Sequence, residues 1–286
     1  MAQFSVTGVY VTLRLLAILV GCFALQAIAQ PLPRPDHIVI VIEENKAYGQ
    51  IIGNGDTPYI NALAKRGMLF TQSYGVTHPS QPNYLALFSG TTHGITGDEC
   101  PLEFSGDNLA SALIAKGLSF ASYAESMPVA GAFGCVYGVY YRKHNPAADW
   151  KGLEAMILPF SAFPQDFEKL PTVALVVPNL RNDMHDGSIA DGDAWLEKNI
   201  GSYAKWTLTH NSLLIVTWDE DNHTDNNRIA TIFVGSMVKR GNSAQRINHY
   251  SILRTIEEMY GLTYLNESAQ AKPIRDAWRA SRRAGK

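Results

Sequence analysis

The sequence predicts an α/β protein, specifically a three-layer α/β/α sandwich built on a mostly parallel sheet. Apolar runs rich in β-branched residues recur along the chain, as in HIVIVIE (37–43) and TVALVV (172–177). Such continuous runs are typical of strands that are buried on both faces. Segments with a helical spacing of apolar residues separate the runs. Strands that alternate with helices form parallel sheets whose two faces are covered by those helices.

The elements follow this alternation from the first strand onward. The run 37–43 predicts the first strand, and TPYINALAKRG (57–67) predicts a helix that ends at Gly67. MLFTQSYG (68–75) predicts a second strand. Further strands are expected in 118–126, 172–179, 212–221 and 228–235, and further helices in 105–117, 190–206 and 251–262. The segment 128–171 is rich in Gly, Tyr and Pro, does not fit the alternation, and is expected to be an insertion packed over the site.

Composition excludes several classes of protein. Of the 286 residues, 46% are apolar and 17% are charged, which is typical of a packed globular chain and not of a disordered or collagen-like one. The formal net charge is −2, so the strongly basic surface of a nucleic-acid-binding protein is not expected. We therefore expect no nucleic-acid partner.

Residues 1–29 are interpreted as a secretory signal peptide. Arg14 is the only charged residue there, an apolar run follows in 15–25, and Ala27-Ile28-Ala29 forms a small-x-small cleavage site. Cys22 lies in a sequence that resembles a lipoprotein box, but the apolar run continues past it, so ordinary cleavage is favoured. The remaining segment, 30–286, is expected to be a single domain without a stable membrane span, secreted or periplasmic.

Two cysteines remain after the predicted cleavage, Cys100 and Cys135. In an oxidising compartment such a pair is most simply a disulfide. The alternative is a soft-metal site, but no Cys-x-x-Cys spacing or neighbouring Cys/His pair supports it.

Polar residues follow directly after several of the apolar runs. The carboxyl ends of parallel strands meet at one edge of a sheet, where ligands bind. The residues at these positions are Glu43, Glu44, Asn45, Thr77, His78, Ser80, Asn179, Asp183, His185, Asp186, Asp219, Glu220, Asp221, Asn222 and His249. Crowded carboxylates repel each other unless a cation neutralises them. Oxygen ligands favour Mg²⁺, Ca²⁺ or Mn²⁺, and nearby imidazoles widen the choice to Zn²⁺.

Ser80 stands out in THPSQPNYLALFSG (77–90), where a polar run with two prolines precedes a helical run. A serine at a helix N-terminus lies beside backbone N–H groups and the positive end of the helix dipole, both of which favour a phosphate. A metal in contact with the hydroxyl would lower its pKa and make it a nucleophile. The alternative is that Ser80 only caps its helix.

The other candidates also have structural interpretations. Asp219 to Asp221 fit a solvated turn, and Glu44 fits a surface charge, although two acids at the end of a buried strand argue against that. His185 fits a residue that orients a loop, and His249 fits a helix start without a partner. The basic run Arg142 to His144 fits either a wall facing an anionic substrate or a solvated loop.

Several motifs together resemble one family, and in matching order they extend from about His37 to Gly261. They are EEN (43–45), THPSQPNYLALFSG (77–90), GDECP (97–101), YRKHNPA (141–147), VPNLRNDMHDGS (177–188) with GDAWL (192–196), and TWDEDN (217–222). This set resembles the bacterial and fungal phosphoesterase family of the alkaline phosphatase superfamily. That family contains secreted acid phosphatases and phosphatidylcholine-type phospholipases C.

The resemblance implies a role for each matching residue. The implied metal ligands are Glu44, Ser80, Asp219 and Glu220. The implied catalytic residues are Ser80 as the nucleophile that is phosphorylated and then hydrolysed, Asn45, His185 and His249. The implied substrate-binding residues are Asn83, Lys143 and His144. The family's acid phosphatases typically carry two aspartates where this chain has Asp219 and Glu220, so Asp221 is an alternative ligand.

From the resemblance we expect the domain 30–286 to be a metal-dependent phosphoesterase acting on a small-molecule or lipid phosphate ester. A phosphomonoesterase is favoured, because the chain lacks the C-terminal extensions that phospholipase members often carry. The alternatives are a phosphodiesterase or phospholipase C on the same site, and a non-catalytic cation-binding protein. A sulfatase is disfavoured, because the nucleophile segment lacks the Cys/Ser-x-Pro-x-Arg pattern.

Overall fold

The computed structural model describes residues 1–3 and 31–280, and the chain divides into two units, 1–31 and 32–286. The described part of the first unit contains no helix or strand. Residues 4–29 of the predicted signal peptide, including Cys22, lie outside the described residues. Within the described ranges, no helix combines the length and hydropathy needed to cross a bilayer.

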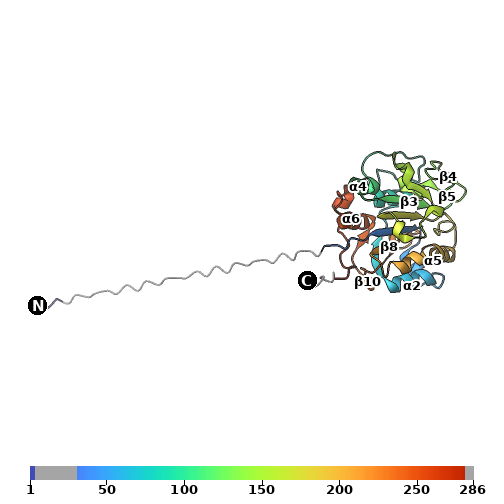
Figure 1. Ribbon diagram of the computed structural model, residues 1–286. Helices are drawn as coiled ribbons and strands as arrows, with labels where there is room; N and C mark the ends of the chain where they lie inside the picture. Colours follow the sequence, from blue (N-terminus) through green and yellow to red (C-terminus); the bar gives the residue numbers. More distant parts are fainter. Residues whose placement is uncertain (4–30, 281–286) are drawn as a thin grey trace. The chain divides into compact units, whose positions relative to one another are not determined.

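The second unit is built on a nine-stranded sheet in the order β10-β2-β9-β8-β1-β7-β3-β6, with β11 also paired to β2 (Figure 1). The strands are β1 (His37–Glu43), β2 (Met68–Tyr74), β3 (Phe120–Ala124), β6 (Ile157–Pro159), β7 (Val173–Val177), β8 (Ser212–Trp218), β9 (Arg228–Val234), β10 (Gly241–Ser243) and β11 (Ile247–Asn248). The central strand β1 is parallel to both β7 and β8. The predicted α/β/α fold with a mostly parallel sheet is confirmed.

One strand, β9, runs antiparallel to both of its neighbours, β8 and β2. The nine residues between β8 and β9 contain no helix. A parallel neighbour needs a crossover of a dozen or more residues, whereas a short loop returns the chain in the opposite direction. The short connection therefore explains the orientation of β9.

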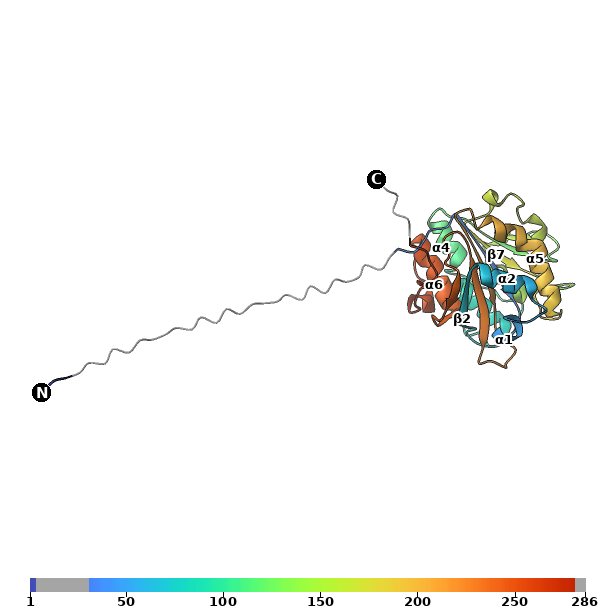
Figure 2. The same ribbon diagram turned by 90° about the horizontal axis from the view of Figure 1, so that it is seen from below.

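Helices cover both faces of the sheet (Figure 2). One face packs against α3 (Ser80–Ser89), α4 (Leu109–Ala115) and α6 (His249–Tyr260), and the other packs against α1 (Tyr48–Ile51), α2 (Pro58–Arg66) and α5 (Ile189–Trp206). Side chains alternate along β1, so that Ile40 joins the first apolar layer and Val41 joins the second. Because β1 is buried from both sides, its carboxyl end delivers Glu43 and Glu44 into the interior.

The segment 128–171 does not follow the alternation of strands and helices, yet it contributes one strand to the sheet. It contains the hairpin β4 (Val136–Tyr137) and β5 (Tyr140–Tyr141), and its strand β6 pairs with β3. Five short 3₁₀ turns make up much of the rest: Arg142–His144, Pro146–Asp149, Glu154–Met156, Phe160–Ala162 and Phe167–Lys169.

Two features fix this segment to the domain. The predicted disulfide between Cys100 and Cys135 is confirmed. Arg142 is buried and donates hydrogen bonds to Asp149 Oδ1 (2.9 Å) and to the carbonyl oxygens of Phe133 (2.8 Å) and Leu102 (2.6 Å). Its guanidinium group is therefore buried and does not belong to a solvated loop.

Candidate active site

Ser80 is the first residue of α3, and its hydroxyl points at carboxylates. Pro79 occupies the N-cap position and its side chain makes no hydrogen bond, while Asp98 Oδ1 accepts from the N–H of Gln81 at 3.1 Å. Ser80 Oγ donates to Glu44 Oε2 at 2.8 Å and lies 3.4 Å from Glu220 Oε1. The side chain is buried, with 1% of the residue exposed. The capping interpretation of Ser80 is therefore wrong, because its oxygen is committed to the acidic cluster.

Three buried carboxylates surround this hydroxyl. Glu44 follows β1, and Asp219 and Glu220 follow β8, which lies beside β1 in the sheet. Their residues are 0%, 1% and 4% exposed, so a solvated turn at 219–221 is excluded. The adjacent parallel strands β1 and β8 thus bring Glu44 and Asp219 together at their carboxyl ends, as the sequence predicted.

Asn45 links these two strand ends. Its φ of 51° lies in the left-handed region, which asparagine tolerates better than most residues. This turn lets the backbone N–H of Asn45 donate to Asp219 Oδ1 at 3.0 Å. The side-chain amide satisfies both of its ends when its nitrogen lies 3.1 Å from Glu220 Oε1 and 3.2 Å from Ser80 Oγ. Asn45 then acts as a hydrogen-bond donor at the centre of the site.

Burial and mutual repulsion disfavour the ionised forms of these three carboxyl groups. Burial, reinforced by the charges of Asp219 and Asp183, raises the pKa of Glu44 well above its usual value. Burial raises the pKa of Asp219 to about 7, and burial together with the charge of Asp219 raises the pKa of Glu220 to about 9. A positive charge among them would restore the ionised forms. The donor set of carboxylates and a hydroxyl fits a hard divalent cation such as Mg²⁺, Ca²⁺ or Mn²⁺.

A second group of donors shares Glu44 with the first. One ligand atom each from Glu44, His144 and His185 lies within 4.8 Å of the others. His144 Nε2 is 3.4 Å from Glu44 Oε1, and its Nδ1 is 3.3 Å from Asp183 Oδ2. A carboxylate with two imidazoles fits a borderline cation such as Zn²⁺. Glu44 is therefore the residue on which both possible cation sites depend.

His144 lies deeper than either interpretation of the run Arg142 to His144 suggested. The residue is 1% exposed, and burial, followed by the charges of Lys143 and His185, holds the pKa of His144 well below its usual value. The imidazole is therefore neutral and faces carboxylates. His185, in contrast, is partly exposed, and its Nδ1 contacts Asp186 Oδ1 at 2.7 Å.

The structure places the other sequence-predicted residues around this centre. His249 is buried behind Asp219, with its Nε2 2.6 Å from the Asp219 carbonyl oxygen, and burial lowers the pKa of His249 to about 4. Lys143 Nζ contacts Asp98 Oδ2 at 2.7 Å. The amide of Asn83 bonds only to backbone: it accepts from Val76 and Thr77 N–H and donates to the Thr77 and Pro79 carbonyls.

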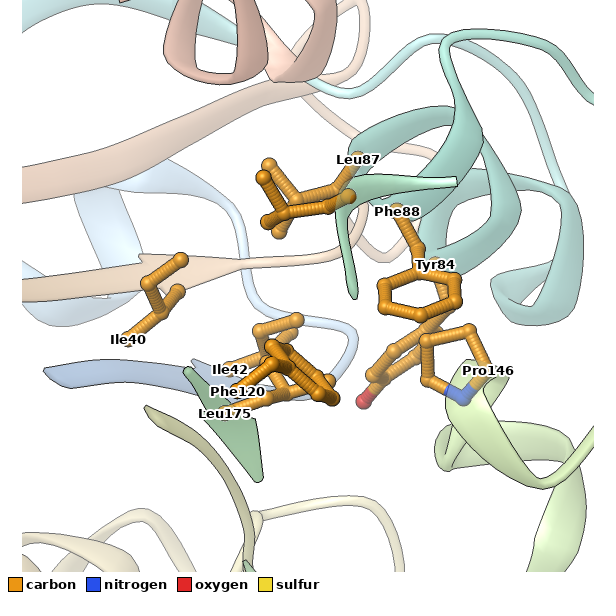
Figure 3. Close-up of a pocket in the computed structure, with 9 residues that line it drawn as sticks. Ile40, Ile42, Tyr84, Leu87, Phe88, Phe120, Pro146 and Leu175 are labelled. Carbon is orange, nitrogen blue, oxygen red and sulfur yellow. The ribbon is translucent and has the colours of Figure 1, made fainter. Parts of the chain in front are cut away.

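Sequence reasoning missed Tyr84, whose hydroxyl donates to Glu44 Oε1. Its ring packs among apolar side chains that line a small cavity between α3 and the sheet, including Phe88, Phe120 and Leu175 (Figure 3). Tyr84 follows Ser80 by four residues, and residues four apart share one face of a helix. That spacing is the signal that would have found it.

His78 is a second residue whose place the sequence did not reveal. Its Nδ1 contacts Glu220 Oε2, its Nε2 lies 3.4 Å from Asp221 Oδ1, and its ring stacks on His223 with the centroids 3.9 Å apart. Its side chain is 26% exposed, so solvent reaches it. The sequence placed His78 after the second strand but gave it no partner.

Replacing Tyr84 with phenylalanine tests how far the hydroxyl orients Glu44. The ring and its apolar contacts remain, so we expect the melting temperature to change by only a few degrees. Loss of one hydrogen bond to a buried carboxylate should lower kcat about tenfold, measured on p-nitrophenyl phosphate. An unchanged kcat at every divalent-cation concentration would show that Glu44 holds its position without Tyr84.

The raised carboxyl pKa values predict how metal-free protein responds to alkali. Glu220 changes from about 4.5 when unfolded to about 9 when folded, so its contribution to stability is lost as pH rises through 9. The pKa values of His78, His144 and His249, which lie beside this cluster, are lowered by burial, so the folded protein does not gain charge on them over this range. We expect the melting temperature of chelator-treated protein to fall between pH 7 and 9, and to fall less in Glu220→Gln. Equal falls in both proteins would contradict this assignment.

Residues 54–263 match the sequence model of the Phosphoesterase family. The chain belongs to the phosphoesterase family. A curated relative, the phosphatidylinositol-3-phosphatase of Mycobacterium tuberculosis, is 46% identical over 254 residues, covering 87% of this chain and 85% of the relative. Another, the phosphate-repressible acid phosphatase of Penicillium chrysogenum, is 30% identical over 226 residues, covering 72% of this chain and 55% of the relative. The chain thus spans about half the length of the fungal acid phosphatases it matches.

The fold of this phosphoesterase also matches solved structures. A protein of the alkaline phosphatase superfamily from Vibrio parahaemolyticus superposes with a TM-score of 0.58 at 14% identity, covering 86% of this chain and 71% of the other. This likeness shows the fold. Family membership and the phosphatase relatives together support the hydrolysis of phosphate esters as the activity of this phosphoesterase.

Proposed function

We propose that this phosphoesterase is a metal-dependent phosphomonoesterase that acts through a phosphoserine formed on Ser80. The observation that carries the proposal is the buried hydroxyl at the start of α3, 2.8 Å from Glu44 Oε2 and close to Glu220. A hydroxyl group that donates a hydrogen bond to a carboxylate can transfer its proton to that carboxylate. The amino end of α3 favours the anion that would be bound there.

The residues of the chain divide the reaction between them. Glu44 accepts the Ser80 proton as Ser80 Oγ forms its bond to phosphorus and the bond to the leaving oxygen breaks. The Asn45 amide donates to a phosphoryl oxygen as negative charge is redistributed. His185, which is partly exposed beside Glu44, donates a proton to the leaving oxygen. Water then forms a bond to phosphorus and gives its proton to His185, while the bond from phosphorus to Ser80 Oγ breaks and Glu44 returns its proton to Oγ.

A divalent cation held by Glu44, Ser80, Asp219 and Glu220 would lower the pKa of the hydroxyl and neutralise phosphoryl oxygens. The raised pKa values of Asp219 and Glu220 support this requirement, because the site is poorly suited to hold several negative charges alone. We assign His249 to positioning, since its Nε2 contacts the carbonyl of Asp219 and not the hydroxyl of Ser80.

The substrate we propose is a phosphate monoester, either a small molecule or a lipid. The names of the relatives support this, since one is a phosphatidylinositol-3-phosphatase and another is an acid phosphatase. Action outside the cytoplasm is part of the proposal. It is supported by the disulfide between Cys100 and Cys135, which persists in oxidising compartments, and by the predicted signal peptide in 1–29.

Hydrolysis of p-nitrophenyl phosphate and of its bis ester tests the proposal. We expect the monoester to be the better substrate, a chelator to stop the reaction, and one added divalent cation to restore it. Preference for the bis ester would instead indicate a phosphodiesterase on the same site. No release with any cation would indicate a cation-binding protein without catalysis.

A further inference from the structure

An uncharged loop beside the site exposes an unusual concentration of apolar side chains. Residues 127–141, which we call the apolar loop, contain no Asp, Glu, Lys, Arg or His. Among the described residues, seven large hydrophobic side chains are exposed, and four of them belong to this loop: Val129 (63%), Phe133 (46%), Val136 (47%) and Tyr137 (37%). Single exposed apolar residues need no explanation, but four of them on one short uncharged loop point to an interaction surface.

The apolar loop is held in this exposed conformation by the domain. The disulfide ties Cys135 to Cys100, and Arg142 donates from Nη1 to the Phe133 carbonyl and from its backbone N–H to the Cys135 carbonyl (2.8 and 2.9 Å). The N–H of Gly131 donates to the Ile157 carbonyl at 2.8 Å. A loop tied at these points cannot fold its apolar side chains inward, so their exposure is part of the fold.

The apolar loop continues directly into the active site. Residue 144, three positions after its last residue, is His144, which lies 3.4 Å from Glu44. The Val139 carbonyl accepts a hydrogen bond from the N–H of Leu180 at 3.1 Å, which attaches β4 and β5 to the segment that carries Asp183 and His185. In Figure 1 the hairpin β4–β5 lies at the upper right, far from α6.

We propose that the apolar loop docks this phosphoesterase on a lipid surface and presents the adjoining site to phosphate monoesters of lipids. The choice of substrate rests on the proposed function, whereas the docking does not. Aromatic and aliphatic side chains on an uncharged loop suit the boundary between headgroups and acyl chains, where tyrosine is favoured.

The size of the loop favours a lipid surface over a second copy of the chain. A stable protein interface uses about 20 to 30 residues from each partner, whereas this loop offers four exposed apolar side chains. Insertion into a lipid surface demands no matching shape, and its strength increases with the apolar area buried.

Flotation with phosphatidylcholine vesicles tests the docking. We expect the purified protein to float with the vesicles, and the double variant Val129→Ser/Phe133→Ser to partition at least about tenfold more weakly. Ile114→Ser is the matched control, because Ile114 is 44% exposed on α4, outside the apolar loop. We expect this control to bind as the unaltered protein does.

Two activity measurements separate docking from catalysis. All three proteins should hydrolyse p-nitrophenyl phosphate equally, while kcat/KM for phosphatidic acid embedded in the vesicles should fall about tenfold in the double variant only. Equal flotation of all three proteins, or none by the unaltered protein, would overturn the docking proposal. So would a dimer, measured by analytical ultracentrifugation, that the double variant abolishes. Flotation without turnover of any phosphate ester would instead contradict the proposed function.

Discussion

Replacing Ser80 with alanine should abolish turnover of p-nitrophenyl phosphate, lowering kcat by at least about 10³-fold. The reason is geometric: Ser80 Oγ lies at the amino end of α3 and within 3.4 Å of two carboxylates, and the methyl group of an alanine offers no atom that can bond to phosphorus. The fold should persist, because the change removes one oxygen from a helix that apolar side chains hold in place. We expect the melting temperature to shift by only a few degrees.

Ser89→Ala is the matched control for this variant. Ser89 is equally buried, lies at the opposite end of the same helix, and donates to the Leu85 carbonyl at 2.8 Å. We expect this control to retain kcat. Near-normal turnover in Ser80→Ala, with the control also active, would show that Ser80 is not the nucleophile.

Replacing Glu44 with glutamine should have the second largest effect. Glu44 accepts hydrogen bonds from Ser80 and Tyr84, lies beside His144, and belongs to both groups of possible cation ligands. The amide keeps the size of the side chain but removes its charge and half of its acceptor capacity. We expect kcat to fall at least about 10²-fold and the protein to retain less divalent cation after gel filtration, measured by elemental analysis.

The neighbouring Glu43 supplies a control that is equally buried. Both residues are 0% exposed, but neither oxygen of Glu43 contacts Ser80. Burial, followed by the charges of Asp183, Glu125 and Asp193, raises the pKa of Glu43 well above its usual value. Glutamine keeps the size of a buried side chain whose oxygens have no hydrogen-bond partner among the described residues. Glu43→Gln should retain activity and cation. Equal losses in both variants would show that Glu44 has no special role.

The sequence revealed the parts of the site that follow strand ends. Glu44 and Asp219 come directly after apolar runs, and adjacent parallel strands bring such ends together, so their meeting was predictable from pattern alone. The position of Ser80 was predictable too, because a proline-rich run precedes its helix. The disulfide between Cys100 and Cys135 was predictable from the number of cysteines and the expected compartment.

The part of the site that the sequence did not reveal lies in the segment 128–171. His144 lies in a segment of short 3₁₀ turns without periodicity, so nothing local indicated that the chain returns to bury this imidazole between Glu44 and Asp183. The two residues before it in the sequence, Arg142 and Lys143, form separate ion pairs with Asp149 and Asp98. Tertiary contacts thus divide a run that looks like one basic patch into three different environments.

Trapping the reaction intermediate tests whether Ser80 carries the phosphoryl group. The protein would be mixed with p-nitrophenyl phosphate and a divalent cation, quenched in acid within the first turnovers, digested, and analysed by mass spectrometry. We predict one added phosphoryl group on the peptide that contains Ser80, and none on that peptide in Ser80→Ala. A phosphoryl group on a residue other than Ser80, or the same modified peptide in Ser80→Ala, would show that Ser80 is not the nucleophile.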